Sequence, residues 1–191
     1  MSKKDQLQAS REKIDAIDDE VIALISRRAE LAKQIADLKR KEGAISYYRP
    51  EREAEVLRRV MTSNPGPLSN KEMAVLFRQI MSACLALEEP IKVAYLGPEG
   101  TFTQEATLKH FGQSVTTSPK LAIDEVFRDV EAESCDYGVV PVENSTEGII
   151  NQTLDSFIDS SLTICGEVEL PIHQHFLVVV NAQDTKITRV Y

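Results

Sequence analysis

The stretch DQLQASREKIDAIDDEVIALISRRAELAKQIADLKRKE, residues 5–42, decides the fold of the first half of the chain, because it contains neither glycine nor proline. Its apolar residues recur at helical spacing; they are Leu7, Ile14, Ile17, Val21, Leu24, Ile25, Leu31, Ile35 and Leu38. A helix of this length spans about 57 Å. A region of about 90 residues is too small to bury such a helix alone. We therefore expect the helix, which Gly43 is predicted to end, to pack against a second copy of the chain.

Two shorter helices are predicted after this one. Pro50 suits the first turn of a helix that runs to about Met61. Ser69 and Glu72 have the spacing of a capping box and are predicted to open a third helix, which Pro90 closes. The apolar stripe of the third helix consists of Met73, Leu76, Phe77, Ile80, Met81, Cys84 and Leu87. The first part of the chain is therefore predicted to be an all-helical, three-helix domain.

The sequence pattern changes at residue 91. Strands are predicted at residues 91–96, 137–142 and, as two strands interrupted near Pro171, 162–180. Helices are predicted at residues 104–111, 118–133 and 145–158, the second of them starting at Ser118-Pro119. Alternation of strands and helices favours an α/β domain with a largely parallel sheet. The predicted fold class is thus α + α/β, with a helical domain at 1–90 and an α/β domain at 91–191.

The charge of the chain is divided unevenly between these domains. Residues 1–90 hold 16 Lys/Arg and 15 Asp/Glu, and residues 91–191 hold 6 and 15, which together give the net charge of −8. The acidic second half argues against nucleic acid as a partner. No apolar run reaches the roughly 20 residues of a membrane span, and the charged N-terminus is unlike a signal peptide, so we expect a cytoplasmic protein. Its three cysteines show no C-x-x-C pair, and no metal site or disulfide framework is predicted.

Basic residues on the long helix suggest an anion site. Arg28 and Lys39 are 11 positions apart, so they point within about 20° of each other and are separated by about 16 Å along the axis. Arg11 lies about 25 Å from Arg28 and roughly 100° around the helix. One pocket that uses all three must take Arg11 from another subunit. From spacing alone, solvated charges on a coiled-coil-like helix are the competing interpretation.

A family resemblance favours the first interpretation. The run Leu7-x-x-x-Arg11-x-x-Ile14-x-x-Ile17-Asp18, then Leu24-Ile25-x-x-Arg28-x-x-Leu31-Ala32 and Lys39, resembles the all-helical chorismate mutases. The segment Tyr48-Arg49-Pro50-Glu51-Arg52-Glu53 and the stretch from Leu76-Phe77 to Glu88 continue the match. The resemblance implies an intertwined homodimer that rearranges chorismate to prephenate within one molecule, with no cofactor.

The resemblance also implies roles for single residues. Arg28 and the partner subunit's Arg11 would bind the substrate carboxylates, and Lys39 would donate to the ether oxygen. Arg52 would support substrate binding and Glu53 would hold the ring hydroxyl. Glu88 would face the same ether oxygen, where only its protonated form would help, because a carboxylate would repel the developing negative charge. The alternative for Glu88 is a charged residue at a frayed helix end before Pro90. Two further substrate-binding candidates depart from the common pattern: Arg49 lies where an acidic residue often occurs, and Cys84 replaces a small hydroxyl residue.

The second half offers weaker chemical signals. Gly97-Pro98-Glu99-Gly100-Thr101-Phe102 has neither the lysine of a phosphate loop nor a G-x-G-x-x-G pattern. The segment from Pro141 to Gly148 is predicted to lead from a strand into a helix, where hydroxyl and backbone N–H groups would receive a carboxylate. Ordinary helix capping by Asn144 or Ser145 is the alternative. His173 and His175 alternate on a predicted strand, and we expect a structural role for them rather than a metal site.

Three motifs together resemble the start of a prephenate dehydratase domain, the first lobe of a periplasmic-binding-like fold. They are residues 95–102, residues 138–145 and Gly166-Glu167. The candidate residues of this lobe are Thr101, Glu143, Asn144, Ser145 and Thr146. The order of mutase and then dehydratase is that of bifunctional enzymes of phenylalanine biosynthesis.

The resemblance implies further dehydratase parts that residues 91–191 do not contain. These parts are a second lobe with a Thr-Arg-Phe motif and a phenylalanine-binding domain. The last five residues resemble a strand just beginning, so we expect the lobe to be truncated and unable to dehydrate prephenate. A different class of function is a non-catalytic dimeric helical module fused to a ligand-binding α/β lobe. A third interpretation, a sensor of phenylalanine or prephenate, requires a cleft between two lobes.

Overall fold

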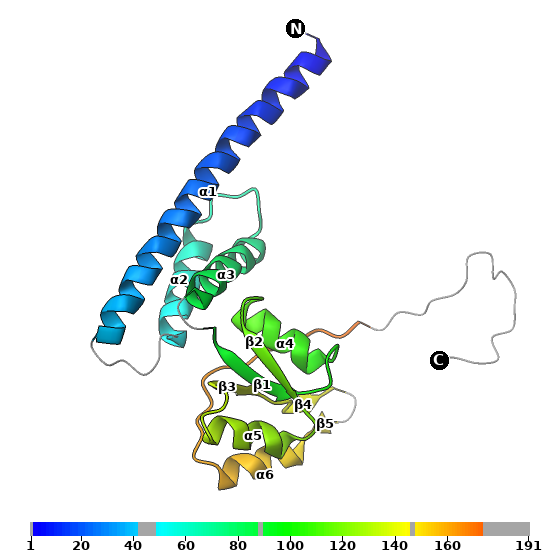
Figure 1. Cartoon of the computed structure of the whole chain (residues 1–191). Coiled ribbons are helices and arrows are strands. Elements are labelled where there is room, and N and C mark those ends of the chain that lie inside the picture. The colour runs from blue at the N-terminus through cyan, green and yellow to red at the C-terminus, as the bar shows by residue number, and fades with distance from the viewer. Residues whose placement is uncertain (1, 42–48, 88–89, 146–147, 174–191) are drawn as a thin grey trace, which may run out of the picture.

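The computed structural model describes residues 2–41, 49–87, 90–145 and 148–173. Three helices come first: α1 (Lys3–Lys41), α2 (Pro50–Ser63) and α3 (Asn70–Ala86). An α/β region follows and lies against one end of the helical region (Figure 1). The predicted succession of a helical region and an α/β region is confirmed. Gly43, which we expected to end α1, and Glu88 lie outside the described residues.

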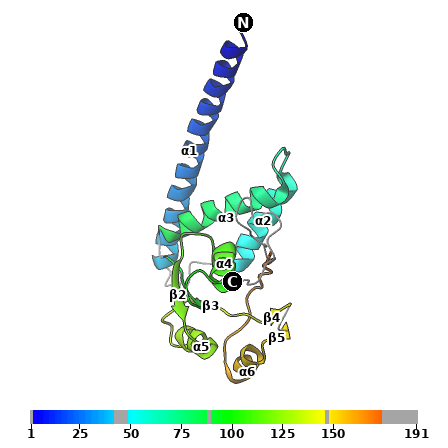
Figure 2. The same ribbon diagram turned by 90° about the vertical axis from the view of Figure 1, so that its right-hand side faces the viewer.

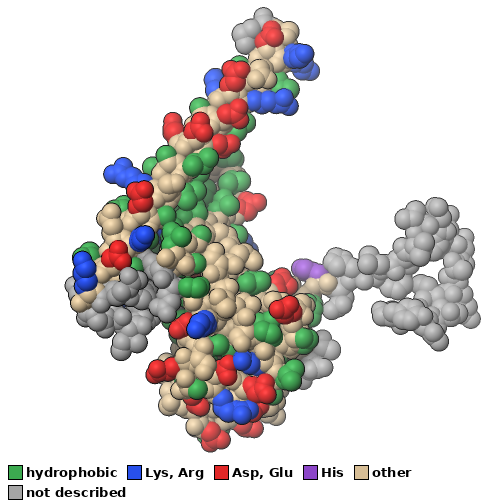
Figure 3. Space-filling model, viewed as in Figure 1, with side chains coloured by type: hydrophobic (Ala, Val, Ile, Leu, Met, Phe, Trp, Pro, Cys, Tyr) green, Lys and Arg blue, Asp and Glu red, His purple; other side chains and the backbone are tan. Residues whose placement is uncertain are grey.

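Helix α1 extends well beyond α2 and α3 (Figure 1, Figure 2). Its N-terminal half stands clear of α2 and α3 in two perpendicular views (Figure 1, Figure 2). Ala36 is the one buried residue among the side chains of α1 that the structure describes. Hydrophobic side chains line the exposed helix (Figure 3); they include Leu7, Ile14, Ile17, Val21, Ile22, Leu24 and Ile25. Within one chain, the apolar face of α1 is thus exposed to water.

Helices α2 and α3 pack together, and α3 also contacts α1. Leu57 of α2 and Cys84 of α3 are buried. The predicted capping box of α3 is confirmed. The backbone N–H of Glu72 donates to Ser69 Oγ at 3.2 Å, and the backbone N–H of Ser69 donates to Glu72 Oε2 at 2.9 Å. Two N–H groups that the first turn leaves without intrahelical partners are thereby satisfied.

Replacing Ser69 with alanine is expected to lower the free energy of unfolding by about 1 kcal/mol, the typical cost of losing an N-cap side chain. Chemical denaturation followed by circular dichroism measures the difference. Lys71→Ala, at an exposed position in the same turn, is the matched control and should change stability little. An equal loss in the two variants would contradict a specific capping role for Ser69.

The capping effect should depend on pH. Hydrogen bonds from Ser69 hold the pKa of Glu72 below its ordinary value. A lowered pKa in the folded state means that the stabilisation is complete above the ordinary pKa of glutamic acid. The stabilisation is lost as the pH falls through the lowered value. The difference between the unmodified chain and the Ser69→Ala variant should therefore shrink in acid.

The α/β region is built on a three-stranded parallel sheet in the order β2-β1-β3, which confirms the predicted parallel sheet. The strands are β1 (Lys92–Leu96), β2 (Thr116–Lys120) and β3 (Tyr137–Val139). In the central strand, Val93 and Ala94 are buried and point to opposite faces. Val93 packs with Phe111 of α4 (Phe102–Phe111), and Ala94 packs with Val126 of α5 (Ile123–Glu131). The two helices therefore cover opposite faces of the sheet.

The start of α5 differs from the prediction. Ser118 and Pro119, which we expected to open a helix, lie in β2. Helix α5 begins only at Ile123. Proline lacks an N–H group and is confined to edge strands and bulges within a sheet. In the described part of the chain β2 pairs only with β1, so Pro119 occupies an edge strand.

The segment after β3 also differs. Strand β3 is shorter and less buried than the strand predicted at residues 137–142, because it too is an edge strand in the described sheet. Two short antiparallel strands follow, β4 (Glu143–Asn144) and β5 (Gly148–Ile149). Helix α6 (Asn151–Asp159) comes next and packs on α5, with the rings of Phe127 and Phe157 4.9 Å apart. The start predicted for this helix, residue 145, was therefore wrong, because the helix begins at Asn151.

The strands predicted at residues 162–180 are not found in the part that the structure describes. Residues 160–173 form no helix or strand, so His173 is not in a strand as we expected. His175, like the predicted strand at the end of the chain, lies outside the described residues.

Candidate active site

A cavity of about 380 Å³ lies between the three helices. This size falls within the range typical of small-molecule sites. Its polar lining consists of Arg28, Lys39, Arg49, Arg52, Glu53, Arg59, Ser82 and Cys84. Its apolar lining includes Leu31, Ala32, Ile35, Val56, Phe77, Met81 and Leu85. Two residues of the α/β region, Ile91 and Phe111, complete the wall.

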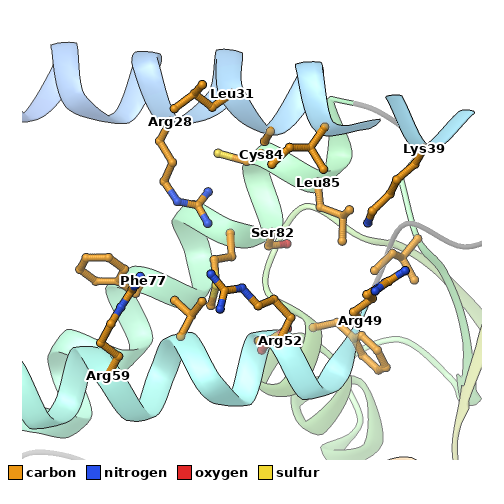
Figure 4. Close-up of a pocket in the computed structure, with 17 residues that line it drawn as sticks. Arg28, Leu31, Lys39, Arg49, Arg52, Arg59, Phe77, Ser82, Cys84 and Leu85 are labelled. Atoms are coloured by element: carbon orange, nitrogen blue, oxygen red, sulfur yellow. The ribbon is translucent and has the colours of Figure 1, made fainter. Parts of the chain in front are cut away.

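Five basic side chains surround this cavity. Arg28 and Lys39 come from α1, Arg52 and Arg59 from α2, and Arg49 lies just before α2. Figure 4 shows the basic side chains of α1 and those of α2 extending from facing helices into the space between them. The seven-residue separation of Arg52 and Arg59 is close to two helical turns, so both are on one side of α2. Such a concentration of positive charge in a concave site attracts a small anion.

The ion pairs beside the cavity differ in how tightly they are held. Arg52 pairs with Glu55, and both side chains are more than half exposed, at 59% and 61%. An exposed pair contributes little, so the guanidinium of Arg52 can turn toward a ligand at small cost. Glu53 accepts a hydrogen bond from Arg78 Nε at 3.0 Å, and these side chains are 15% and 26% exposed. Arg78 therefore restrains the Glu53 carboxylate.

The structure brings most of the predicted substrate-binding residues to one cavity. Those that line it are Arg28, Lys39, Arg49, Arg52, Glu53 and Cys84. Arg11 is exposed and does not line the cavity, since it lies about 25 Å from Arg28 along α1. Glu88 is outside the described residues.

Sequence reasoning missed two polar residues of this site, Arg59 and Ser82. Arg59 was detectable, because its spacing from Arg52 places both on one face of the second helix. Ser82 carried no comparable signal. It is buried because the α/β region packs against it.

The candidates in the α/β region are more dispersed. The hydroxyl of Thr101 donates to the carbonyl oxygen of Pro98 at 2.9 Å, just before α4. Glu143 and Asn144 form β4, Ser145 follows them, and Thr146 lies outside the described residues. The helix expected to begin here starts only at Asn151, so our interpretation of this segment as a helix N-terminus for a carboxylate was wrong.

No group of three or more His, Cys, Asp or Glu among the described residues is arranged to hold a metal ion. No helix in the described ranges is both long and apolar enough to cross a membrane. The cysteines Cys84, Cys135 and Cys165 are free thiols.

Two known families account for almost the whole chain. Chorismate mutase type II matches residues 10–89, and prephenate dehydratase matches residues 93–191, more than half of the chain. This chain belongs to the prephenate dehydratase family. It carries a chorismate mutase type II region ahead of its dehydratase region, which confirms the resemblance to both families.

Relatives named "Bifunctional chorismate mutase/prephenate dehydratase" match along the full chain. The relative from Stutzerimonas stutzeri is 57% identical over 196 residues, which are 100% of this chain and 53% of the relative. That from Pseudomonas aeruginosa is 57% identical over 195 residues, with the same coverage. That from Escherichia coli K12 is 30% identical over 213 residues, covering 100% of this chain and 54% of the relative. The chain thus spans about half the length of the relatives it matches.

Among solved structures, chorismate mutase (Form II) from Thermus thermophilus is 36% identical to this chain. The match covers 44% of this chain and 94% of that one, with a TM-score of 0.43.

Proposed function

We propose that the helical region catalyses the rearrangement of chorismate to prephenate in the cavity between α1, α2 and α3. The observation that carries this proposal is the convergence of five basic side chains and one carboxylate on a cavity of about 380 Å³. If the basic residues were only solvated charges on a coiled-coil-like helix, those of α1 and α2 would not be expected to line one cavity. The match to chorismate mutase type II supplies the substrate class.

The chemistry of this reaction suits such a site. Chorismate is a small dianion that rearranges within one molecule, without a nucleophile or a proton transfer. The enzyme must hold a compact conformer and stabilise the negative charge that develops on the ether oxygen as its bond to carbon breaks. In our proposal Arg28 binds a carboxylate and Lys39 donates to the ether oxygen. Arg52 supports substrate binding, and Glu53 accepts a hydrogen bond from the ring hydroxyl.

A homodimer with shared active sites is part of the proposal. The exposed apolar face of α1 supports it, because a second α1 would remove this face from water. A two-fold partner would also bring its own Arg11 to the cavity, which Arg11 of the same chain does not line. We also propose that the chain divides into two domains between residues 90 and 91, and that the protein is cytoplasmic.

We propose that the α/β region forms part of a prephenate dehydratase domain. The match at residues 93–191 supports this assignment. In the whole protein, the product of the first reaction would then be the substrate of the second. Thr101, Glu143, Asn144, Ser145 and Thr146 stay candidates for contacts with prephenate.

Purified chain is expected to convert chorismate to prephenate much faster than the uncatalysed reaction. The loss of chorismate absorbance gives the rate. Since substrate and product are isomers, NMR rather than mass identifies prephenate. The Arg28→Ala variant, with a similar circular dichroism spectrum, is the control and should lose most of the activity. A rate no higher than that without protein would refute the proposed function.

A further inference from the structure

The α/β region packs closely against α3 along a seam made by the end of α4 and the turn after it. The backbone N–H of Gln113 donates to Gln79 Oε1 at 3.0 Å, and that of Ser114 donates to Ser82 Oγ at 3.3 Å. Gly112 adopts a φ of 85°, and a Cβ atom on it would lie 2.5 Å from Ser82 Cβ. The backbone of the α/β region thus approaches α3 as closely as glycine allows.

Arg78 connects this seam to the mutase cavity. Its Nε donates to Glu53 Oε1 at 3.0 Å, and its Nη1 donates to the backbone carbonyl oxygen of Lys109 at 3.2 Å. Lys109 is in the last turn of α4, where carbonyl groups lack intrahelical partners and carry partial negative charge. One guanidinium therefore bridges a cavity residue of α2 and the end of a helix in the α/β region. The fixed fork of arginine suits such a double contact.

The Arg78–Glu53 contact is part-buried, whereas the contact of Arg78 with the Lys109 carbonyl is exposed. The ring of His110 lies near both charged groups, and burial lowers its pKa, an effect that Glu53 opposes. Gly166 approaches the same ring, because a Cβ atom on it would lie 3.0 Å from His110 Cε1. The Nζ of Lys109 also donates to the carbonyl oxygen of Glu169 at 2.6 Å. The end of α4 is thus held from both sides, and the part-buried Arg78–Glu53 pair is screened less by water than an exposed pair.

We propose that Arg78 is a positioning residue of the mutase site and that the α/β region holds it in place. Arg78 fixes the direction of the Glu53 carboxylate, and the carbonyl of Lys109 fixes Arg78. Phe111, two residues further on, lines the cavity itself. The α/β region is then a structural part of the mutase site. The inference rests on the proposed function, because it requires Glu53 to bind the ring hydroxyl of chorismate.

Arg78→Gln and Arg78→Lys test this assignment in the full chain. Arg78→Gln should lower kcat/KM for chorismate by about tenfold, as expected for a lost charge-assisted contact to a binding group. Arg78→Lys should recover part of this loss, since lysine keeps the charge but lacks the fork. The control is Gln79→Ala, which removes a hydrogen bond across the same seam without touching Glu53. The kcat/KM of Gln79→Ala should stay within about twofold of that of the unmodified chain, because Gln79 and Glu53 share no hydrogen-bond partner.

A double-mutant cycle separates positioning from general stability. In a Glu53→Ala background, Arg78→Gln should cause no further loss, because the group that Arg78 orients is gone. Additive losses, or full activity in Arg78→Gln, would overturn the inference while the mutase function stands. Equal losses in Gln79→Ala and Arg78→Gln would also overturn it. If Arg78→Gln does not fold, the Arg78→Lys variant is the test. Full activity in Arg78→Lys, while Glu53→Ala has lost activity, would overturn the inference that the arginine fork positions Glu53. An inactive unmodified chain would refute the proposed function itself.

Discussion

Replacing Lys39 with alanine is expected to slow the rearrangement of chorismate by about 100- to 1000-fold, the usual cost of one donor to a developing oxyanion. Lys39 lines the cavity from α1, about 16 Å along the axis from Arg28. In the proposed arrangement its ammonium group faces the ether oxygen, which gains negative charge only as the bond breaks. The loss should therefore appear mainly in kcat and less in KM.

Steady-state kinetics with chorismate checks this expectation. Lys33→Ala is the matched control, because Lys33 is an exposed lysine of the same helix that does not line the cavity. It should retain nearly full turnover. Lys39→Ala with turnover close to that of the control would remove Lys39 from the catalytic machinery. A rise in KM with unchanged kcat would instead assign it to substrate binding alone.

Mixing two inactive variants, Arg11→Ala and Arg28→Ala, is expected to restore activity. If each site takes Arg28 from one subunit and Arg11 from the other, a mixed dimer has one intact site and one site with both lesions. Random exchange makes half of the dimers mixed, so about a quarter of the sites should be intact. Activity is measured after co-refolding of the two variants, with mixed dimers confirmed by a tag on one of them.

A second mixture supplies the control. Unmodified chain is combined in equal amounts with a variant that carries both substitutions. Shared sites leave no intact site in the mixed dimers, so activity should fall to about a quarter of that of unmodified chain alone. Sites contained within one chain predict about a half. No recovery in the first mixture, together with half activity in the second, would refute shared sites.

The helical region could be predicted almost fully from the sequence, because its signals are local. An unbroken apolar period marks α1, and Ser69 with Glu72 marks the start of α3 at the residue where the structure has it. The α/β region was harder. Pro119 has the same local chemistry at a helix start and in an edge strand, and only the pairing of β2 with β1 distinguishes them. Strands as short as β4 and β5 leave no periodicity to detect.

The residues of the candidate site likewise fall into those that local spacing predicts and those that it does not. Arg28 and Lys39 share a helix face, so their common direction follows from helical geometry. Phe111 and Arg78 join the site through contacts between segments that are distant in sequence, such as the bond from Arg78 to the Lys109 carbonyl. No sequence spacing reports such a contact.

The bare apolar face of α1 ties the folding of this protein to the amount of it that is present. In the proposed dimer, much of the hydrophobic free energy of α1 comes from a second chain, so unfolding releases two molecules. The midpoint temperature of such a protein rises with its concentration. Dilution would then dissociate the dimer and destabilise α1 and the anion site together. One helix supplies both the contact surface and the side chains of Arg28 and Lys39.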